Sequence, residues 1–307
     1  MKITCLAGGT GGPKLLVGLA RIVEGEDLTA IVNTADDDVI YDVYVSPDVD
    51  IVTYWLAGIG DMERGWGLRG DTFNMVEGLR ALDVDAWFSL GDRDFATCLF
   101  RTARMSEGAT LSSVTDEIRR RLGVAAKVIP MSDDRVRTMI ATGDGRTLEF
   151  QEYFVKERQE PDVSIVTLDG IHDAKPAPGV IEAIEGADRV LISPSNPLVS
   201  TGPILSVRGV REALVAHPDV VAISPIIRGA ALKGPADVML RSIGVQSSAS
   251  GVASLYSDFC DTFVIDATED AHELDAVKAQ GVAAVATDTI MRDADASERI
   301  ARTLLEL

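Results

Sequence analysis

A glycine-rich turn, Gly8-Gly9-Thr10-Gly11-Gly12, directly follows an apolar, strand-like run at the start of the chain. Glycines let the backbone approach phosphate oxygens closely, and the N-terminus of the helix expected next offers unpaired N–H groups. Pro13 suits the first helical turn and Lys14 adds a positive charge. The spacing matches neither the Walker loop nor the G-x-G-x-x-G fingerprint. The turn therefore predicts binding of a phosphate-bearing nucleotide; the alternative is a tight strand–helix turn without a ligand.

Two acidic loops come next along the chain. The first, Asn33-Thr34-Ala35-Asp36-Asp37-Asp38, begins where the second apolar run ends, and the second is Ser46-Pro47-Asp48-Val49-Asp50. Carboxylate oxygens are the ligands that Mg²⁺ prefers, and a carboxylate can also serve as a general base. We expect Asp36, Asp37 and Asp48 to hold Mg²⁺. The alternative is a solvated loop in an acidic chain.

A third segment, Leu90-Gly91-Asp92-Arg93-Asp94-Phe95-Ala96-Thr97, alternates charges at the expected start of a helix. Arg93 has the planar guanidinium that clamps a phosphate or carboxylate with two hydrogen bonds. The same side chain could equally form a structural ion pair with Asp92 and Asp94. The residue types alone leave these alternatives open.

Two proline-rich loops in the second half each begin with Ser-Pro after an apolar run, at residues 193–203 and 224–235. Because parallel strands end at the same edge of a sheet, we expect the two loops to form one binding wall. Serine hydroxyls and Asn196 can hydrogen-bond a base or a sugar, and Arg228 and Lys233 offer positive charge to phosphate. The alternative is a pair of rigid structural loops.

The elements that must position these residues follow from the apolar runs. Such runs, rich in β-branched residues and alternating with helix-like patterns, are typical of a parallel sheet buried on both faces. The predicted strands are 2–7, 28–33, 189–193, 220–224, 262–266 and 283–287; the predicted helices are 12–23, 209–216, 235–243, 252–258, 269–280 and 294–306. We expect a single α/β domain over residues 1–307, a doubly wound, mainly parallel Rossmann-like fold.

The middle of the chain departs from this alternation. Residues 135–141 and 146–155 form two strand-like runs around the turn Gly143-Asp144-Gly145, a pattern typical of an antiparallel hairpin. A hairpin inside a protein of alternating strands and helices indicates an inserted α+β subdomain, which we place at about residues 100–185.

The charge of the chain limits its partners. Its 48 acidic and 29 basic residues give a net charge of −19, which argues against nucleic acid as a ligand. The acids include 31 aspartates and the bases only 7 lysines, a balance that suggests adaptation to high salt. We find no apolar run long enough for a membrane span and no secretory signal, and the three scattered cysteines fit a reducing compartment. We therefore expect a cytoplasmic protein with small-molecule substrates.

Taken together, these segments closely resemble the 2-phospho-L-lactate transferase family of deazaflavin (coenzyme F420) biosynthesis. Any one match is weak, but the ordered set covers nearly the whole chain. The matching segments are Gly-Gly-Thr-Gly-Gly-Pro-Lys at 8–14, Asn-Thr-Ala-Asp-Asp at 33–37, Ser-Pro-Asp-x-Asp at 46–50, Leu-Gly-Asp-Arg-Asp-x-Ala-Thr at 90–97, Pro-Met-Ser-Asp-Asp at 130–134, Ser-Asn-Pro at 195–197, Gly-Pro-Ile at 202–204, Ser-Pro-Ile-Ile at 224–227 and Lys-Gly-Pro-Ala at 233–236.

The resemblance implies a Rossmann-like homodimer that requires Mg²⁺. Its reaction transfers 2-phospho-L-lactate, or an enolpyruvyl analogue in some relatives, from a guanosine-diphosphate-linked donor. The acceptor is the terminal ribityl hydroxyl of 7,8-didemethyl-8-hydroxy-5-deazariboflavin, and GMP is released. We expect Asp50 to orient or deprotonate this hydroxyl as the catalytic group. The further residues expected at the deazaflavin are Ser89, Asp92 and Arg93, and those expected at the nucleotide are Gly8, Gly9, Thr10, Gly11, Gly12, Lys14, Ser195, Asn196, Ser224 and Lys233.

The chain departs from the family pattern on the acceptor side. Ser89 stands where the family usually has Lys or Arg, Cys98 where His is usual, and Ile51 where Thr is usual. Arg228, at a position where glycine is common, is a candidate for replacing the missing cation. The alternative function is that of a regulatory protein that binds nucleotide-sugars, because a sister family shares the fold and a similar glycine-rich start.

Overall fold

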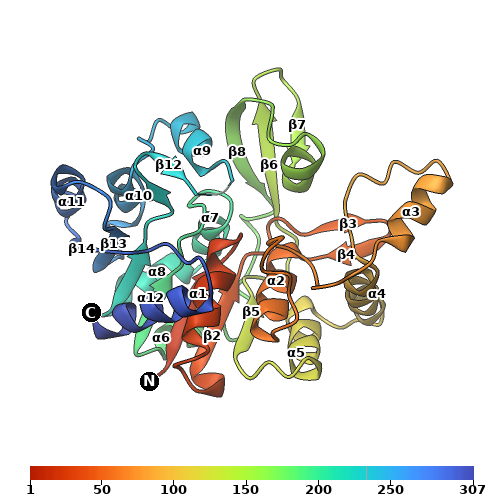
Figure 1. Cartoon of the computed structure of the whole chain (residues 1–307), viewed down its shortest axis with the longest axis horizontal. Coiled ribbons are helices and arrows are strands. Elements are labelled where there is room, and N and C mark those ends of the chain that lie inside the picture. Colours follow the sequence, from red (N-terminus) through yellow and green to blue (C-terminus); the bar gives the residue numbers. More distant parts are fainter. Residues whose placement is uncertain (233) are drawn as a thin grey trace.

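A seven-stranded parallel sheet forms the centre of the computed structural model, which describes residues 1–232 and 234–307 (Figure 1). Its strand order is β14-β13-β10-β9-β1-β2-β5. The strands are β1 Ile3–Ala7, β2 Leu28–Val32, β5 Lys127–Pro130, β9 Arg189–Ile192, β10 Val220–Ile223, β13 Thr262–Asp266 and β14 Ala283–Thr287. The six strands predicted from apolar runs are therefore confirmed within a residue at each end. The edge strand β5 was not predicted.

Both faces of the sheet are buried, as the apolar runs predicted. Side chains of a strand alternate between faces, and β1 divides accordingly: Ile3, Cys5 and Ala7 pack in one core, whereas Leu6 packs in the other. Because both faces are covered, no position of β1 is exposed, and every residue of the strand except Thr4 is apolar. The doubly wound, Rossmann-like fold is confirmed.

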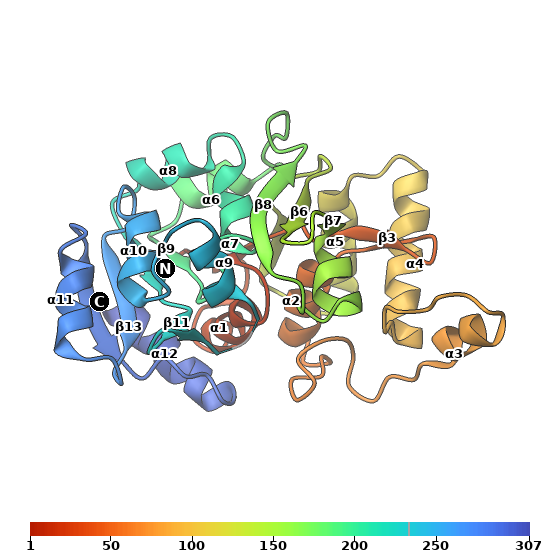
Figure 2. The same ribbon diagram turned by 90° about the horizontal axis from the view of Figure 1, so that it is seen from above.

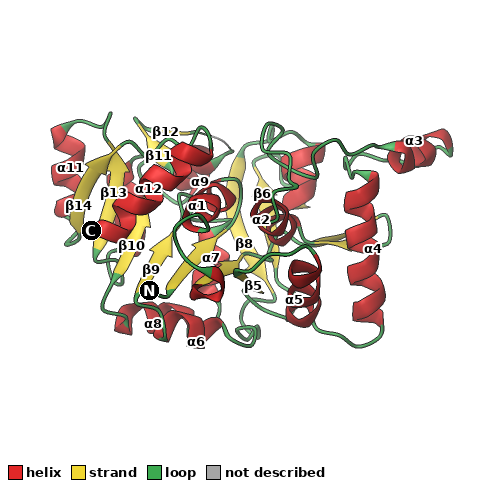
Figure 3. Cartoon of the chain, turned by 60° about the horizontal axis from the view of Figure 1, so that its bottom comes forward, coloured by secondary structure: helices red, strands yellow, loops and turns green. Residues whose placement is uncertain are grey.

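Helices cover each face of the sheet (Figure 3). The core that contains Cys5 also contains apolar residues of α1 Gly11–Leu19, α2 Pro47–Leu56 and α12 Ala294–Glu306. The core that contains Leu6 is closed by the other set of helices. This set includes α6 Val180–Glu185, α7 Thr201–Ser206, α8 Val210–Ala216, α9 Ala236–Ser242, α10 Ala249–Tyr256 and α11 Ala271–Lys278. Among the described residues, no helix combines the length and the apolarity needed to cross a membrane.

A long excursion leaves the sheet after β2 and returns at β5. It contains the hairpin of β3 Asp38–Ile40 and β4 Val43–Val45, then α2, α3 Asn74–Ala81, α4 Asp92–Ser106 and α5 Leu111–Arg121. Part of this excursion extends away from the sheet, with α3 at its far end (Figure 2). The excursion has its own small core, which includes Val45, Val76, Leu90 and Cys98. The excursion also carries Asp48, Asp50 and Asp94, which line the cavity of the candidate site.

A second, antiparallel sheet of order β7-β6-β8 stands beside the central one. Its strands are β6 Arg137–Thr142, β7 Thr147–Glu149 and β8 Val163–Asp169, and β6 and β7 form the predicted hairpin. The second predicted strand was too long, because the chain enters a π-helix at Glu152–Lys156. The expected insertion at 100–185 thus contains this sheet, but it also contains β5, which belongs to the central sheet.

Candidate functional site

A cavity of about 610 Å³ opens at the carboxyl ends of β1, β2, β9 and β10. The loops that follow these strands contribute residues to its wall, as expected for a ligand site in a parallel α/β sheet. The rest of the wall comes from α2, the start of α4, the segment around the π-helix, and loops of the C-terminal half. The cavity therefore brings together segments that are far apart in the sequence.

Most of the site residues predicted from the sequence line this one cavity. They come from the glycine turn, both acidic loops, the segment before α4, and both Ser-Pro loops. The predicted residues in its wall are Gly9, Thr10, Gly11, Lys14, Asp36, Asp48, Asp50, Ser89, Ser195, Asn196 and Ser224.

The other predicted residues are placed elsewhere. Gly8, Gly12, Asp37, Asp92 and Arg93 are absent from the cavity wall. Lys233 lies outside the described residues. Arg228, considered as a substitute cation, donates from Nε to the carbonyl of Thr268 at 3.1 Å, and it too is absent from the wall.

The glycine turn brings the N-terminus of α1 to the cavity. Gly11 lies so close to the loop after β9 that a Cβ there would be 2.2 Å from the carbonyl oxygen of Pro194. Gly9 has a φ of +56°, in the region that favours glycine. Its N–H donates to Oδ1 of Asp48 at 2.9 Å, which joins the turn to the second acidic loop. Close packing at Gly11 and the backbone conformation at Gly9 therefore favour glycine independently of any ligand.

Asp36 and Asp48 form a buried acidic pair around one amide group. Nδ2 of Asn33 donates to Oδ2 of Asp36 at 3.0 Å and to Oδ2 of Asp48 at 2.9 Å, and it also lies 3.1 Å from the carbonyl of Val199. An amide nitrogen has two hydrogens for these three acceptors. Oδ1 of Asp36 is buried and makes no hydrogen bond of good geometry; the donor beside this carboxyl group is the Thr138 hydroxyl, which is buried too and lowers the pKa of Asp36.

Burial raises the pKa of both carboxyl groups in this acidic pair, and the charge of Asp48 raises that of Asp36 further. Acceptors thus outnumber donors at this point in the cavity wall. A divalent cation, or a proton, would correct that imbalance, so the donor set fits Mg²⁺, which prefers carboxylate oxygens.

Asp37 plays a different part in the same loop. The hydroxyl of Ser46 lies 2.8 Å from each of its carboxylate oxygens. Burial raises the pKa of Asp37 to about 8, although the Ser46 hydroxyl opposes this shift. Asp37 therefore fastens the start of α2 to the loop after β2, behind the cavity wall.

Asp50 is held by a buried arginine. The guanidinium of Arg101, on α4, forms a bidentate ion pair with Asp50; Nη1 lies 3.1 Å from Oδ2, and Nη2 also donates to Oδ1. The Arg101 side chain is fully buried and Asp50 nearly so. Burial raises the pKa of Asp50, and the guanidinium counteracts that shift. The ion pair fixes both carboxylate oxygens at the cavity wall.

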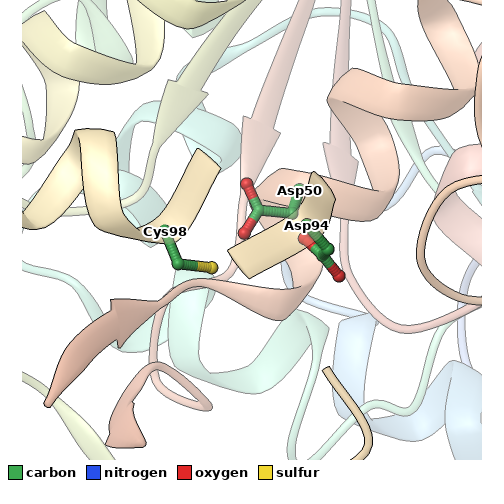
Figure 4. A group of neighbouring side chains, drawn as sticks. All are labelled: Asp50, Asp94 and Cys98. Atoms are coloured by element: carbon green, nitrogen blue, oxygen red, sulfur yellow. The ribbon is translucent and has the colours of Figure 1, made fainter. Parts of the chain in front are cut away.

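Two further groups, those of Asp94 and Cys98, lie close to Asp50 (Figure 4). One oxygen of Asp94, the Sγ of Cys98 and one oxygen of Asp50 lie within 4.8 Å of one another. The hydroxyl of Tyr54 donates to Oδ1 of Asp94 at 2.8 Å. Burial, with the charge of Asp50 second, raises the pKa of Asp94 to about 7.

Asp92 and Arg93 stabilise the fold around the site. Asp92 accepts hydrogen bonds from the side chains of Thr72 and Asn74 and from the backbone of Met75, and these bonds lower its pKa to about 2. Arg93 donates to the carbonyl of Arg69 at 2.8 Å and pairs with Asp71 at 3.7 Å. Its ion-pair partner is thus neither of the adjacent aspartates.

The Ser-Pro loops are held by their own polar groups. The Ser195 hydroxyl donates to the carbonyl of Gly8 at 2.6 Å, and Ser224 exchanges hydrogen bonds with the backbone of Ile226. Oδ1 of Asn196 accepts from the backbone of Leu198 at 2.9 Å. These bonds shape the loops, so the structural interpretation is confirmed, whereas a binding role for these polar groups stays a prediction.

Sequence reasoning missed an aromatic wall and the arginine. Trp66, Phe88, Phe150 and Phe154 line the cavity, and the rings of Phe150 and Phe154 stack with centroids 5.3 Å apart. Lys156 of the π-helix lies 3.3 Å from Asp85, in the loop that leads to Phe88.

The spacing of residues along the two helices could have pointed to Arg101 as the partner of Asp50. Residues 94, 98 and 101 share one face of α4, and residues 50 and 54 share one face of α2, because side chains three or four apart are neighbours on a helix. The aromatic wall offers no such signal, because its members come from three segments whose proximity depends on the tertiary fold.

Comparisons with known proteins identify the family of the chain. A model of the family described as 2-phospho-L-lactate transferase CofD matches residues 3–305. A phosphoenolpyruvate transferase of Streptomyces griseus is 43% identical, with 100% of this chain and 98% of that protein covered. A 2-phospho-L-lactate transferase of Methanosarcina mazei is 40% identical, with 98% of each chain covered.

One solved structure, a UPF0052 family protein from Bacillus halodurans, superposes with a TM-score of 0.67 over 99% of this chain and 98% of its own, at 19% identity. At that identity the likeness supports the fold alone. The family model and the full-length relatives are far more specific. The chain therefore belongs to the 2-phospho-L-lactate transferase CofD family.

Proposed function

We propose that this protein is the transferase that moves a 2-phospho-L-lactyl or enolpyruvyl phosphate group from a guanosine-diphosphate-linked donor to the ribityl hydroxyl of a deazaflavin, releasing GMP, in coenzyme F420 biosynthesis. The observation that carries the proposal is the single cavity in which a helix N-terminus, an acidic pair and Asp50 meet. Phosphoryl-type transfer depends on positioning and charge neutralisation, and these groups supply both.

The donor is expected on the side of the glycine turn. Gly9, Thr10 and Gly11 bring backbone groups to the cavity where α1 begins, and Lys14 lines the wall one turn later. A helix N-terminus favours a phosphate through its N–H groups and partial positive charge. The polar loop residues Ser195, Asn196 and Ser224 border the same space and are placed to recognise the nucleoside.

Asp36 and Asp48 are the residues that would hold Mg²⁺, since both line the cavity and their oxygens exceed the available donors. When bound there, the ion would neutralise negative charge on the donor diphosphate. Asp37, whose oxygens both accept from Ser46, would support these ligands from behind.

The acceptor is expected between the aromatic wall and Asp50. A flat, conjugated ring system suits the faces of Trp66, Phe88, Phe150 and Phe154, because aromatic rings prefer stacked or edge-to-face contacts. Ser89 lies next to Phe88 in this wall and offers a hydroxyl to the acceptor. Asp50 would then orient the ribityl hydroxyl toward the donor phosphorus.

The relatives leave the donor open. A phosphoenolpyruvate transferase and a 2-phospho-L-lactate transferase are 43% and 40% identical to this chain, so identity favours neither donor decisively.

A homodimer and a Mg²⁺ requirement are also part of the proposal. Mass measurement in solution tests the homodimer, and metal titration tests the Mg²⁺ requirement. The alternative is a nucleotide-sugar-binding regulator of the same fold. The Asp50–Arg101 ion pair beside an aromatic wall favours the transferase over this regulator.

The test is to incubate the protein with the deazaflavin, Mg²⁺ and either the lactyl or the enolpyruvyl donor, and to quantify GMP and product by mass. We expect GMP and product in equal amounts with one donor or both. Binding of a UDP-sugar with no turnover of either donor would instead favour the regulator.

A further inference from the structure

Asp50 is poorly suited to accept a proton, although it lies at the cavity. Both of its oxygens face the buried guanidinium of Arg101, in a bidentate pair. A bidentate pair gives both carboxylate oxygens an N–H donor, so neither oxygen can take up a proton without displacing the guanidinium. Asp50 can therefore orient a hydroxyl as a fixed acceptor, but taking up its proton would break the ion pair.

Asp94 is the neighbouring carboxylate without such a constraint. It lies at the start of α4, lines the cavity and shares the cluster of Figure 4 with Asp50. Its Oδ1 accepts from the Tyr54 hydroxyl at 2.8 Å. Its Oδ2 lies 3.8 Å from the point that a Cβ on Gly67 would occupy, and Gly67 also lines the cavity.

The cluster suits a proton better than a metal ion. Asp50, Asp94 and Cys98 each present a potential ligand atom within the same 4.8 Å. However, Nη1 of Arg101 lies 3.1 Å from Asp50 and 3.9 Å from the Sγ of Cys98, so a positive charge already occupies the space between them. A second cation would have to sit beside that guanidinium.

We infer that Asp94 is the catalytic residue that receives the proton of the attacking hydroxyl, and that Arg101 is a positioning residue that holds Asp50 in a fixed orientation. The inference rests on the proposed function. The ribityl oxygen forms a bond to the donor phosphorus, and the bond from that phosphorus to the GMP oxygen breaks, its electron pair leaving with GMP. The hydroxyl proton passes to the Asp94 carboxylate, which later releases it to water.

The surroundings of Asp94 set the pH at which it can act. Asp50 and Tyr54 adjoin it from α2, Cys98 and Arg101 from α4, and Asp71 from the segment before α3. Arg64 lines the same cavity, and its Nη1 lies 4.0 Å from the point that a Cβ on Gly67 would occupy. Burial and the charge of Asp50 raise its pKa to about 7, while Tyr54 and Arg101 oppose that rise. A proton acceptor works in its charged form, so turnover should increase as pH rises through about 7.

The test is the pH profile of kcat for the wild type, Asp94→Asn, Asp94→Glu and Tyr54→Phe, with GMP release as the readout. Asp94→Asn should lower kcat by about 10²–10⁴-fold and abolish the rise with pH, while donor binding is retained. Asp94→Glu should restore part of the rate and of the pH dependence. Tyr54→Phe should move the rise to higher pH, because the Tyr54 hydroxyl stabilises the carboxylate.

Asp293→Asn is the matched control. Asp293 accepts from the backbone of Ala296 at the start of α12 and is absent from the cavity wall, so its profile should follow the wild type. An Asp94→Asn enzyme that keeps wild-type kcat and its rise with pH would overturn the role of Asp94 alone. A wild type that forms no GMP with either donor would overturn the proposed function and, with it, this inference.

Discussion

Asp36 lies in the loop after β2, and Asp48 and Asp50 lie in the first turn of α2 rather than in the loop expected there, yet their surroundings give the three residues different chemistry. The acidic pair of Asp36 and Asp48 shares one amide donor and has acceptors to spare. Asp50 is matched with a guanidinium of its own. A buried carboxylate with unsatisfied oxygens is suited to a cation, whereas a paired one is suited to a fixed orientation. Two predictions separate these roles.

The first prediction concerns the acidic pair. Asp36→Asn removes one of two buried carboxylates that repel each other, so the Mg²⁺-free protein should unfold at a higher temperature than the wild type. The same change should raise the Mg²⁺ concentration needed for half-maximal turnover, because a ligand is lost.

Thermal unfolding and turnover across a Mg²⁺ titration measure the two effects. Asp37→Asn is the comparison, since Ser46 bonds both Asp37 oxygens behind the wall and the Mg²⁺ requirement should change less. An Asp36→Asn protein with an unchanged Mg²⁺ requirement would exclude Asp36 as a ligand.

The second prediction concerns Asp50. Asp50→Asn should reduce turnover far more than nucleotide binding, and it should lower the free energy of unfolding by about 3–5 kcal/mol, because Arg101 would remain as an unpaired buried charge. The double variant Asp50→Asn with Arg101→Met removes that charge, so it should regain stability but not turnover. Urea unfolding, calorimetric nucleotide binding and GMP release measure the three quantities. Recovery of turnover in the double variant would mean that Asp50 acts only through stability.

At the scale of elements, the site depends on how closely the glycine turn packs against its neighbours. Gly11 allows the start of α1 to approach the loop after β9, with no room for a Cβ beside the Pro194 carbonyl. The approach brings the turn, the Ser-Pro loop and the acidic pair to one cavity. The glycines are therefore part of the packing as well as of the expected phosphate site.

The third prediction follows from this packing. Gly11→Ala should lower the free energy of unfolding by about 1–3 kcal/mol, because overpacking against backbone forces the loop to move. The control is Gly78→Ala in α3, where a Cβ meets nothing within 4 Å. It should raise stability by about 0.5–1 kcal/mol, since alanine is the better helix former. Equal stability of the two variants in urea would contradict the packing argument.

The sequence predicted the central sheet and its ligand edge well, because buried parallel strands are apolar runs and polar residues follow them directly. Gly9, Asp36 and Ser224 were placed correctly at one cavity by that reasoning. The partners Arg101 and Phe154 were not predicted. They lie in the excursion and beside the second sheet, whose docking onto the central sheet has no signature in local periodicity.

At the scale of the whole molecule, the surface carries far more acid than base, with a net charge of −19. Many ion pairs are exposed, among them Arg21–Asp295 and Arg299–Asp288. Exposed pairs contribute little individually, so repulsion among the excess carboxylates is the larger effect of this surface. Salt screens that repulsion over a distance of about 10 Å at 0.1 M.

The fourth prediction is that the unfolding midpoint rises as KCl increases from low to molar concentration, because screening removes the repulsion of the folded state. Thermal unfolding followed by circular dichroism across a KCl series measures it, with and without Mg²⁺ to separate bulk screening from occupancy of the acidic pair. A midpoint that stays level or falls with KCl would contradict adaptation to high salt.

The most direct test of the proposed transfer is a single reaction with deazaflavin labelled with ¹⁸O in its terminal ribityl hydroxyl, together with Mg²⁺ and both donors. If the hydroxyl attacks the donor phosphorus, mass spectrometry should find the label in the phosphodiester product and unlabelled GMP in equal amount. Unlabelled product, labelled GMP, or the absence of product with either donor would contradict the account.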